Sequence, residues 1–219
     1  MTKKDPSEAL LCRRSRASLL LKRVFDIVTA LLALILLCWL FLLIAVLIRL
    51  EDKGPVIYRH MRLGRGGKPI AVYKFRSMKN GADRLEDFLS PEELEEYHRE
   101  FKLDHDPRIT RIGNFLRKSS LDELPQLVNI LKGEMSMVGP RPIVEEELKY
   151  YTPNELAMFQ SVRPGLTGYW QAYARNNATY ESRARQRMEL YYIEHCSILL
   201  DLKILFRTVV SVLKQDGAK

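Results

Sequence analysis

Residues 27–48 read IVTALLALILLCWLFLLIAVLI, and the rest of the chain is organised around this stretch. Thr29 is its only clearly polar member, and it contains no charged residue. As an α-helix it would be about 33 Å long, at ~1.5 Å per residue, which matches the roughly 30 Å hydrocarbon core of a bilayer. The stretch therefore predicts insertion into a membrane, with the following residues working at or near its surface.

Basic residues flank this stretch on both sides. Residues 1–23 contain seven Lys or Arg and two acids, and residues 49–68 contain six Lys or Arg and two acids. Such flanks favour the cytoplasmic side, and one straight span cannot place both ends there. A helix that enters the membrane and turns back satisfies both flanks, whereas the absence of Pro and Gly favours an ordinary one-pass anchor. Asp26, at the edge of the stretch, is expected to find a basic partner or stay at the interface.

Length and charge narrow the class of protein. Without the tail and the membrane stretch, roughly 170 residues remain, enough for one domain with its own core. The chain of 219 residues has a net charge of +8. This charge indicates an anionic partner, and beside a membrane anionic lipid or a phosphorylated substrate fits better than nucleic acid. No zinc-type Cys or His spacing, Walker loop, dinucleotide fingerprint or Gly-x-Ser-x-Gly elbow occurs in the sequence.

The remaining sequence predicts an α+β chain that is mainly helical. Residues 56–58 and 69–76 read as two strands of a β-hairpin with interleaved basic and aromatic residues, joined by a glycine-rich turn. The sequence Ser-Pro-Glu-Glu at residues 90–93 is typical of a helix start. Helices are expected over residues 90–101, 121–131, 180–194 and 199–213 and near Pro142 and Pro153, and turn-rich loops over residues 139–142 and 163–170.

The adjacent acids Asp122 and Glu123 are the sharpest candidates for chemistry, and two interpretations compete. In one, Ser120 and Glu123 form a capping box, which needs no function. In the other, Pro125 occupies the first turn of the helix and leaves both carboxylates at its mouth. There a carboxylate can act as a nucleophile towards phosphate, and two carboxylates can hold Mg²⁺. Candidate phosphate-binding residues, through bidentate guanidinium contacts, are Arg111, Arg117, Arg141, Arg163 and Arg175.

From Lys22 to the C-terminus the chain resembles the bacterial sugar transferases, the monotopic phosphoglycosyl transferases that act on polyprenyl phosphate. The resemblance covers about nine-tenths of the chain, and its motifs follow one another in the family's order. The matching segments are residues 22–26 (KRVFD), 73–78 (YKFRSM), 106–113 (DPRITRIG), 120–126 (SLDELPQ), 131–136 (LKGEMS), 138–142 (VGPRP), 163–168 (RPGLTG) and 200–203 (LDLK).

The resemblance implies an activity and roles for residues. A sugar 1-phosphate would pass from a UDP-sugar to a polyprenyl (undecaprenyl) phosphate with release of UMP, as the first membrane step of bacterial exopolysaccharide, capsule or glycoconjugate synthesis. Asp122 would carry a covalent phosphosugar intermediate, and Glu123 would position Mg²⁺ or handle the acceptor's proton. The implied metal ligands are Asp122 and Glu123. The implied substrate- and phosphate-binding residues are Lys74, Arg117 and Arg141 and, by weaker matches, Arg163, Arg175 and Asp201.

The resemblance also implies an arrangement at the cytoplasmic face of the bacterial inner membrane. Residues 1–21 would form a basic tail, residues 22–50 a re-entrant membrane helix, and residues 51–219 a cytoplasmic catalytic domain carrying the small β-hairpin and interfacial amphipathic helices. This is the family's minimal catalytic form, without nucleic acid as a partner and compatible with a homodimer. The family's membrane helix is broken by a Ser-Pro pair where this chain has Cys38-Trp39, so a break is expected at or next to these residues.

Two other functions stay open at this point. One is a non-enzymatic, one-pass membrane protein whose basic domain binds anionic lipid or nucleic acid. The other is a sugar transferase that works through a ternary complex without a covalent intermediate. The sequence does not choose among sugars.

Overall fold

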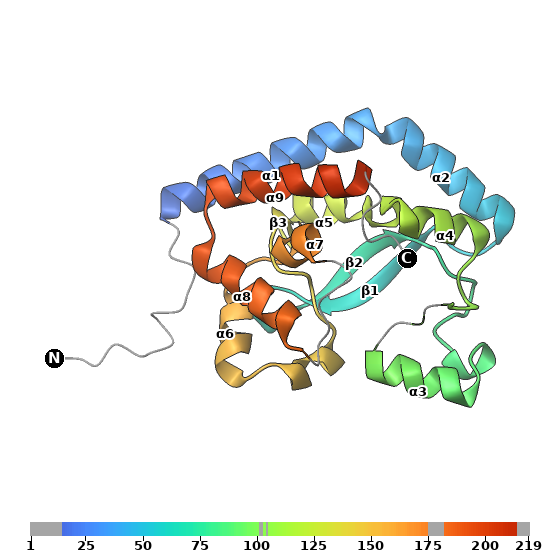
Figure 1. The fold of residues 1–219 in the computed structure, drawn as a ribbon. Coiled ribbons are helices and arrows are strands. Elements are labelled where there is room, and N and C mark those ends of the chain that lie inside the picture. The colour runs from blue at the N-terminus through green and yellow to red at the C-terminus, as the bar shows by residue number, and fades with distance from the viewer. Residues whose placement is uncertain (1–14, 101–102, 104, 175–181, 214–219) are drawn as a thin grey trace.

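The structure, a computed structural model, describes residues 15–100, 103, 105–174 and 182–213. The chain is mainly helical with two small sheets, as the sequence predicts (Figure 1). Its α-helices are α1 (Arg16–Leu36), α2 (Cys38–Glu51), α3 (Pro91–Glu100), α4 (Arg111–Lys118), α5 (Gln126–Lys132), α6 (Pro153–Ser161), α7 (Tyr169–Tyr173), α8 (Ala184–His195) and α9 (Ile198–Leu213). Its strands are β1 (Ile57–Leu63), β2 (Pro69–Phe75), β3 (Ser136–Val138) and β4 (Gly165–Thr167), and its 3₁₀ helices are η1 (Arg65–Gly67), η2 (Leu85–Asp87), η3 (Leu121–Glu123) and η4 (Glu145–Tyr150).

The apolar stretch forms two helices rather than one. α1 and α2 meet at Leu37 with a bend of 62°, next to the expected position at Cys38-Trp39 (Figure 1). Within the described residues, only this bent pair taken together has the length and composition that a membrane crossing requires. The helix is therefore interrupted, as the re-entrant alternative requires, although no Pro or Gly stands at the break.

The cause of the bend lies in packing. Ala30 of α1 is buried in a cluster with Ile130 of α5, whereas Ile44 and Ile48 of α2 are buried in a second cluster with residues of β2 and α4. β2 contributes to both clusters, and Phe41 in the first turn of α2 packs against both, so the two clusters meet at the bend. A chain that follows both surfaces must change direction between them, and it does so at Leu37.

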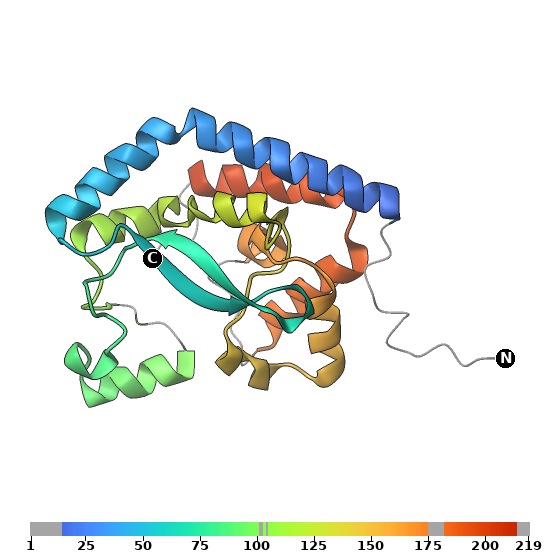
Figure 2. The ribbon, with the colours of Figure 1, turned by 180° about the vertical axis from the view of Figure 1, so that it is seen from behind.

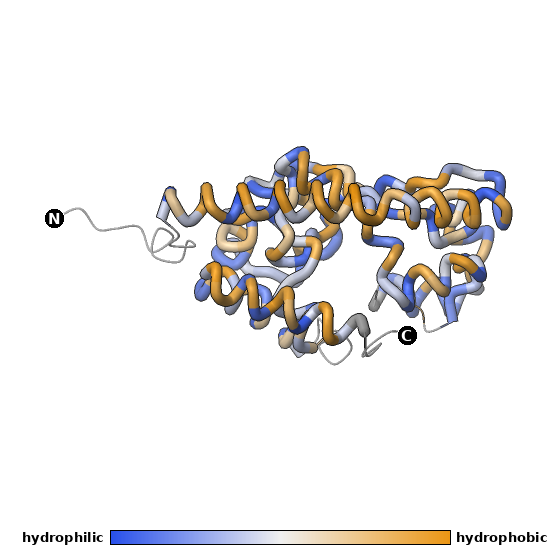
Figure 3. The backbone as a smooth tube through the Cα atoms, turned by 90° about the horizontal axis from the view of Figure 1, so that it is seen from above, coloured by the Kyte–Doolittle hydropathy of each residue, from blue (hydrophilic) through white to orange (hydrophobic). Residues whose placement is uncertain are grey.

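The outer faces of α1, α2 and α9 are apolar. α1 and α9 both lie at the upper face in Figure 1 and are joined by the Lys22–Asp201 ion pair, and hydrophobic residues dominate both when they are seen from above (Figure 3). A monomeric soluble protein rarely exposes a continuous apolar surface of this extent. The exposed residues include Leu20, Val24, Val28, Leu31, Ile35, Leu36, Trp39, Leu42, Val46 and Leu50 on α1 and α2, and Leu199, Leu202, Phe206 and Val209 on α9.

Beneath α1, helix α5 packs against the β1–β2 hairpin, which Figure 2 shows from behind. The hairpin is antiparallel, as predicted, with a register from Ile57 opposite Phe75 to Leu63 opposite Pro69. α5 ends at Gly133, whose positive φ of 82° is readily adopted by glycine. These elements form the base on which the candidate site is built.

Two expectations about the chain's second half are corrected. The loop expected over residues 163–170 contains β4, which pairs in parallel with β3, and it leads into α7. Gly139 and Gly165 lie at this junction, where a side chain on Gly165 would collide with the Gly139 backbone. The helix expected near Pro142 is instead the 3₁₀ helix η4, which begins at Glu145. The helix expected near Pro153 is confirmed as α6.

Asp26 of α1 has different partners from those expected. Its carboxylate is buried and accepts hydrogen bonds from the Ser136 hydroxyl (3.1 Å) and the Met137 backbone amide (2.9 Å). The neighbouring Lys22 instead binds Asp201 at 3.0 Å. The hydrogen bonds of Asp26 thus go to β3 and fasten α1 to this strand, while its charge acts on the nearby Arg163 guanidinium.

Candidate active site

The backbone around Asp122 and Glu123 decides between the two interpretations of this pair. Ser120 has a left-handed conformation (φ 58°, ψ 15°), and its side chain makes no capping hydrogen bond. The acids lie in η3, and α5 begins only at Gln126, directly after Pro125. The capping box is therefore wrong, and the later helix start is confirmed, which leaves both acids just before the helix.

Apolar neighbours hold the acidic pair in place. Leu121 and Leu124 flank the pair and pack against the buried cluster that contains Ile44 and Ile48 of α2. Asp122 is only 8% exposed. The pair is thus fixed where the soluble domain meets the second half of the bent apolar helix.

Strand β2 brings a cation to the pair. The Lys74 ammonium nitrogen lies 2.8 Å from the nearer Glu123 carboxylate oxygen and 4.0 Å from an Asp122 carboxylate oxygen. The structure thus brings together Lys74, Asp122 and Glu123.

His60 extends this site along the hairpin. Tyr58 lies opposite Lys74, and His60 follows two residues later on the same face of the sheet. The His60 Nδ1 atom lies 3.3 Å from an Arg62 guanidinium nitrogen. Because Arg can only donate, Nδ1 accepts, and the ring is neutral with its proton on Nε2. Burial and the charges of Arg62, Lys74 and Arg141 lower the pKa of His60 to about 3.

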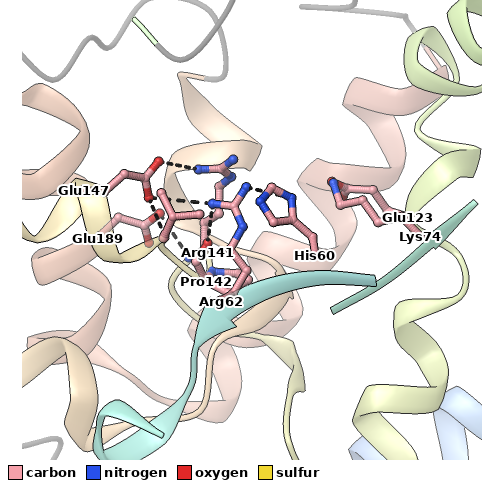
Figure 4. Close-up of polar contacts among 9 residues, drawn as sticks. His60, Arg62, Lys74, Glu123, Arg141, Pro142, Glu147 and Glu189 are labelled. Atoms are coloured by element: carbon pink, nitrogen blue, oxygen red, sulfur yellow. Dashed lines mark hydrogen bonds and ion pairs between the residues drawn. The ribbon is translucent and has the colours of Figure 1, made fainter. Parts of the chain in front are cut away.

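A second group of charged residues continues from His60 (Figure 4). Glu147 lies 3.8 Å from the Arg62 guanidinium and 3.4 Å from the Arg141 guanidinium. The Arg141 backbone amide also donates to the Glu189 carboxylate at 3.2 Å. Burial raises the pKa of Glu189 to about 7. The Gly139–Pro142 loop therefore presents Arg141 at the far end of a polar row that begins at the acidic pair.

Sequence reasoning found Arg141 and Lys74 but missed the residues between them. The signal was present in the hairpin, since Tyr58, His60 and Arg62 alternate and therefore share one face. Glu189 could not be found in this way, because tertiary packing alone brings α8 to the Arg141 loop, whereas Glu147 lies only six residues after Arg141.

The other predicted site residues lie outside the row that runs from the acidic pair to Arg141. Arg163 donates to the Gly133 carbonyl at 2.8 Å, at the C-terminal end of α5. Asp201 binds Lys22 at 3.0 Å and accepts a hydrogen bond from the Tyr192 hydroxyl at 2.7 Å. Both therefore serve as anchors between elements. Arg117 lies in the last turn of α4, where its charge helps to lower the pKa of Asp106, and Arg175 is outside the described residues.

Comparison with known proteins assigns the chain to a family. A family model described as bacterial sugar transferase matches residues 17–215. The chain belongs to this family. The exopolysaccharide production protein ExoY of Sinorhizobium fredii is 44% identical over 200 residues, which cover 90% of this chain and 87% of that protein.

Two longer bacterial sugar transferases are equally similar. The undecaprenyl-phosphate galactose phosphotransferase of Salmonella typhimurium is 44% identical over 206 residues, which cover 93% of this chain and 42% of that protein. The UDP-galactose-lipid carrier transferase of Erwinia amylovora is 45% identical over 205 residues, which cover 92% of this chain and 42% of that protein. The chain thus spans less than half the length of these two relatives.

The acidic pair of this sugar transferase suits a magnesium ion that is shared with a substrate. Mg²⁺ is usually bound through one or two carboxylates, with phosphate oxygens and water completing its octahedron. Asp122 and Glu123 provide such a pair. Among the described residues, no group of three or more Asp, Glu, His or Cys side chains is placed to enclose a metal. The site therefore fits a metal that arrives with a phosphorylated substrate better than one held by protein alone.

Proposed function

We propose that this chain transfers a sugar 1-phosphate from a UDP-sugar to a polyprenyl phosphate and releases UMP. The observation that carries the proposal is the position of Asp122, Glu123 and Lys74 against the bent apolar helix. A lipid-linked acceptor and a water-soluble donor can meet only where a membrane segment and a polar domain join. The printed names of two relatives, an undecaprenyl-phosphate phosphotransferase and a UDP-galactose-lipid carrier transferase, support this substrate pair.

The first step is attack by Asp122 on the β-phosphorus of the donor. A carboxylate oxygen forms the bond to phosphorus, and the bond from phosphorus to the oxygen that bridges the two phosphates breaks. That oxygen leaves with the electron pair as part of UMP, and the sugar phosphate stays on Asp122 as an acyl phosphate.

The second step returns the enzyme to its starting state. A phosphate oxygen of the polyprenyl phosphate attacks the same phosphorus, and the bond to Asp122 breaks. The product is a polyprenyl diphosphate-linked sugar, and Asp122 is again a free carboxylate. One site can therefore handle both substrates in turn.

The geometry favours Asp122 over Glu123 as the nucleophile. Glu123 is in direct contact with Lys74 at 2.8 Å, whereas the Asp122 oxygen lies 4.0 Å from the same ammonium and leaves more room for a phosphoryl group between them. In this arrangement, Glu123 holds the Lys74 ammonium beside the reacting phosphate. Mg²⁺ bound by these carboxylates and the donor phosphates would neutralise charge on the phosphoryl oxygens.

The polar row beyond Lys74 is suited to the donor's phosphates. His60, with its proton on Nε2, offers a neutral donor, and Arg141 offers a guanidinium that suits bidentate phosphate binding. Donors of this kind are most effective when they are held rigidly, as Arg141 is between two prolines.

The bent helix is proposed to enter the cytoplasmic leaflet and return, which keeps both basic flanks on one side. The test uses a chain in which Cys12, Cys38 and Cys196 are all replaced by Ser, with a single cysteine placed at Ser15 or at Lys53, and a membrane-impermeant thiol reagent applied to intact cells. Signal is taken relative to the same chain without the added cysteine. Neither position should be labelled until the cells are permeabilised. Labelling of position 15 in intact cells would mean a true span.

The activity is tested by following nucleotide release. The purified chain is incubated with undecaprenyl phosphate and each of several UDP-sugars, with Asp122→Asn as the inactive variant. Asp87→Asn is the matched control, since Asp87 is exposed and pairs only locally with Arg84. We expect UMP release equal to lipid product for one UDP-sugar, lost in Asp122→Asn and kept in Asp87→Asn. Release of UDP would instead mean transfer of the sugar without its phosphate and would overturn the proposal.

A further inference from the structure

A basic cavity lies beneath the first half of α1, apart from the acidic pair. It encloses about 110 Å³, room for roughly three to four water molecules or one phosphate group. Leu19 lines it at the exposed apolar end of α1. None of its described lining residues belongs to β2 or η3. Its charged lining residues are Lys22, Arg23, Asp26, Arg65 and Arg163.

The cations of this cavity outnumber its anions. Lys22 is paired with Asp201, which lies outside the lining. Among the described lining residues, Asp26 is the one carboxylate beside the three guanidinium groups of Arg23, Arg65 and Arg163. Arg23 and Arg163 also donate to carbonyl oxygens at the end of α5, which supply no full negative charge.

The guanidinium groups are close enough to act on one another. Burial first, and then the charges of Arg23 and Arg65, lower the pKa of the Arg163 guanidinium. Arg163 uses its Nε–H on the Gly133 carbonyl. Its two terminal nitrogens can still donate to a ligand, because the guanidinium group carries five N–H donors in a fixed fork.

The hairpin turn aims Arg65 at this cavity. Gly66 and Gly67 both have φ near +70°, a conformation that L-residues with side chains rarely adopt. The turn packs against α6, with Gly67 beside the Gln160 side chain. Arg65 is thus held at the rim by a turn whose shape its glycines permit.

We propose that this cavity binds the phosphate of an anionic glycerophospholipid headgroup, with Arg65 and Arg163 as its principal donors. The inference depends on the membrane placement in the proposed function. The rim at Leu19 continues into the exposed apolar residues Leu20 and Val24 of α1, along which the acyl chains would lie. The cavity has room for one phosphate group.

The test measures thermal unfolding of the full chain in nanodiscs of phosphatidylcholine with increasing fractions of phosphatidylglycerol. The variants are Arg65→Ala and, as matched control, Lys68→Ala, an exposed cation of the same turn that does not line the cavity. We expect phosphatidylglycerol to raise the melting temperature, and Arg65→Ala to need about five- to tenfold more of it for the same rise. Lys68→Ala should match the wild type.

Three results would overturn the inference. An equal loss of the phosphatidylglycerol response in Arg65→Ala and Lys68→Ala would mean diffuse attraction to an anionic surface. An Arg65→Ala variant that needs no more phosphatidylglycerol than the wild type would show that Arg65 does not bind the headgroup. An equal rise with inorganic phosphate in pure phosphatidylcholine would mean a site for free anions. Asp122→Asn separates this inference from the proposed function, because it should lose UMP release and keep the lipid-dependent rise.

Discussion

Replacing Lys74 with Met should weaken catalysis much more than it weakens the fold. The Lys74 ammonium lies 4.0 Å from an Asp122 carboxylate oxygen, so it would lie at about that distance from the negative phosphoryl group that bonds to Asp122 in the transition state; two opposite charges at this separation interact by about 4 kcal/mol at an effective dielectric constant of ~20. The Lys74 side chain is 26% exposed, so water screens part of this energy, and roughly half is a reasonable working value. A loss of about 2 kcal/mol from the transition state corresponds to a fall in kcat/KM of about 30-fold.

The assay for Lys74→Met is UMP release with donor and acceptor both varied. The matched control is Lys132→Met, because Lys132 lies 2.8 Å from Glu134, the same distance as Lys74 from Glu123, but away from the acidic pair. Lys132→Met should keep wild-type kcat/KM. A Lys74→Met enzyme within about threefold of wild type, or a control that falls equally, would refute the charge argument. Far-UV circular dichroism of both variants checks that the fold is retained.

Two further predictions concern stability, measured by unfolding of the detergent-solubilised chain. Asp26→Ala should lower the free energy of unfolding by about 3–5 kcal/mol, because it leaves the buried Ser136 hydroxyl and Met137 amide without an acceptor. Asp26→Asn keeps an acceptor and should lower it by less than half as much. Equal losses in the two variants would show that the two hydrogen bonds do not stabilise the fold. Burial raises the pKa of Glu189 to about 7, above its usual ~4.3, so the folded state holds a proton more tightly and stability falls as pH rises through this window. Glu189→Gln should therefore match wild type at about pH 4 and be more stable at about pH 8, and a constant difference between the two pH values would contradict this assignment.

Local patterns in the sequence predicted those elements whose residues are close together along the chain. The hairpin followed from alternating residues around a glycine-rich turn, and α6 from a proline at its first turn. The β3–β4 pair could not be predicted in the same way. Each strand has three residues, too few to show a period, and the two strands are separated in the sequence by residues 139–164.

The bend and the acidic pair also depend partly on local sequence and partly on tertiary packing. No Pro or Gly stands near Leu37, and the bend lies where the buried cluster beneath α1 meets the one beneath α2. At the acidic pair, Ser120 and Glu123 gave a false capping box, whereas Pro125 was the correct local signal. The partner of the pair, Lys74, lies nearly fifty residues earlier, so only the family resemblance could suggest it.

Trapping the intermediate tests the central claim most directly. The chain is incubated with UDP-sugar carrying ³²P at the β-phosphate, without acceptor, then denatured, digested and examined for labelled peptides. We predict label on the peptide that contains Asp122, UMP in equal amount, no label in Asp122→Asn, and loss of label when undecaprenyl phosphate is added before denaturation. Turnover without labelled protein would indicate a ternary-complex mechanism, and labelling of Asp122→Asn to the wild-type level would contradict the assignment of the nucleophile.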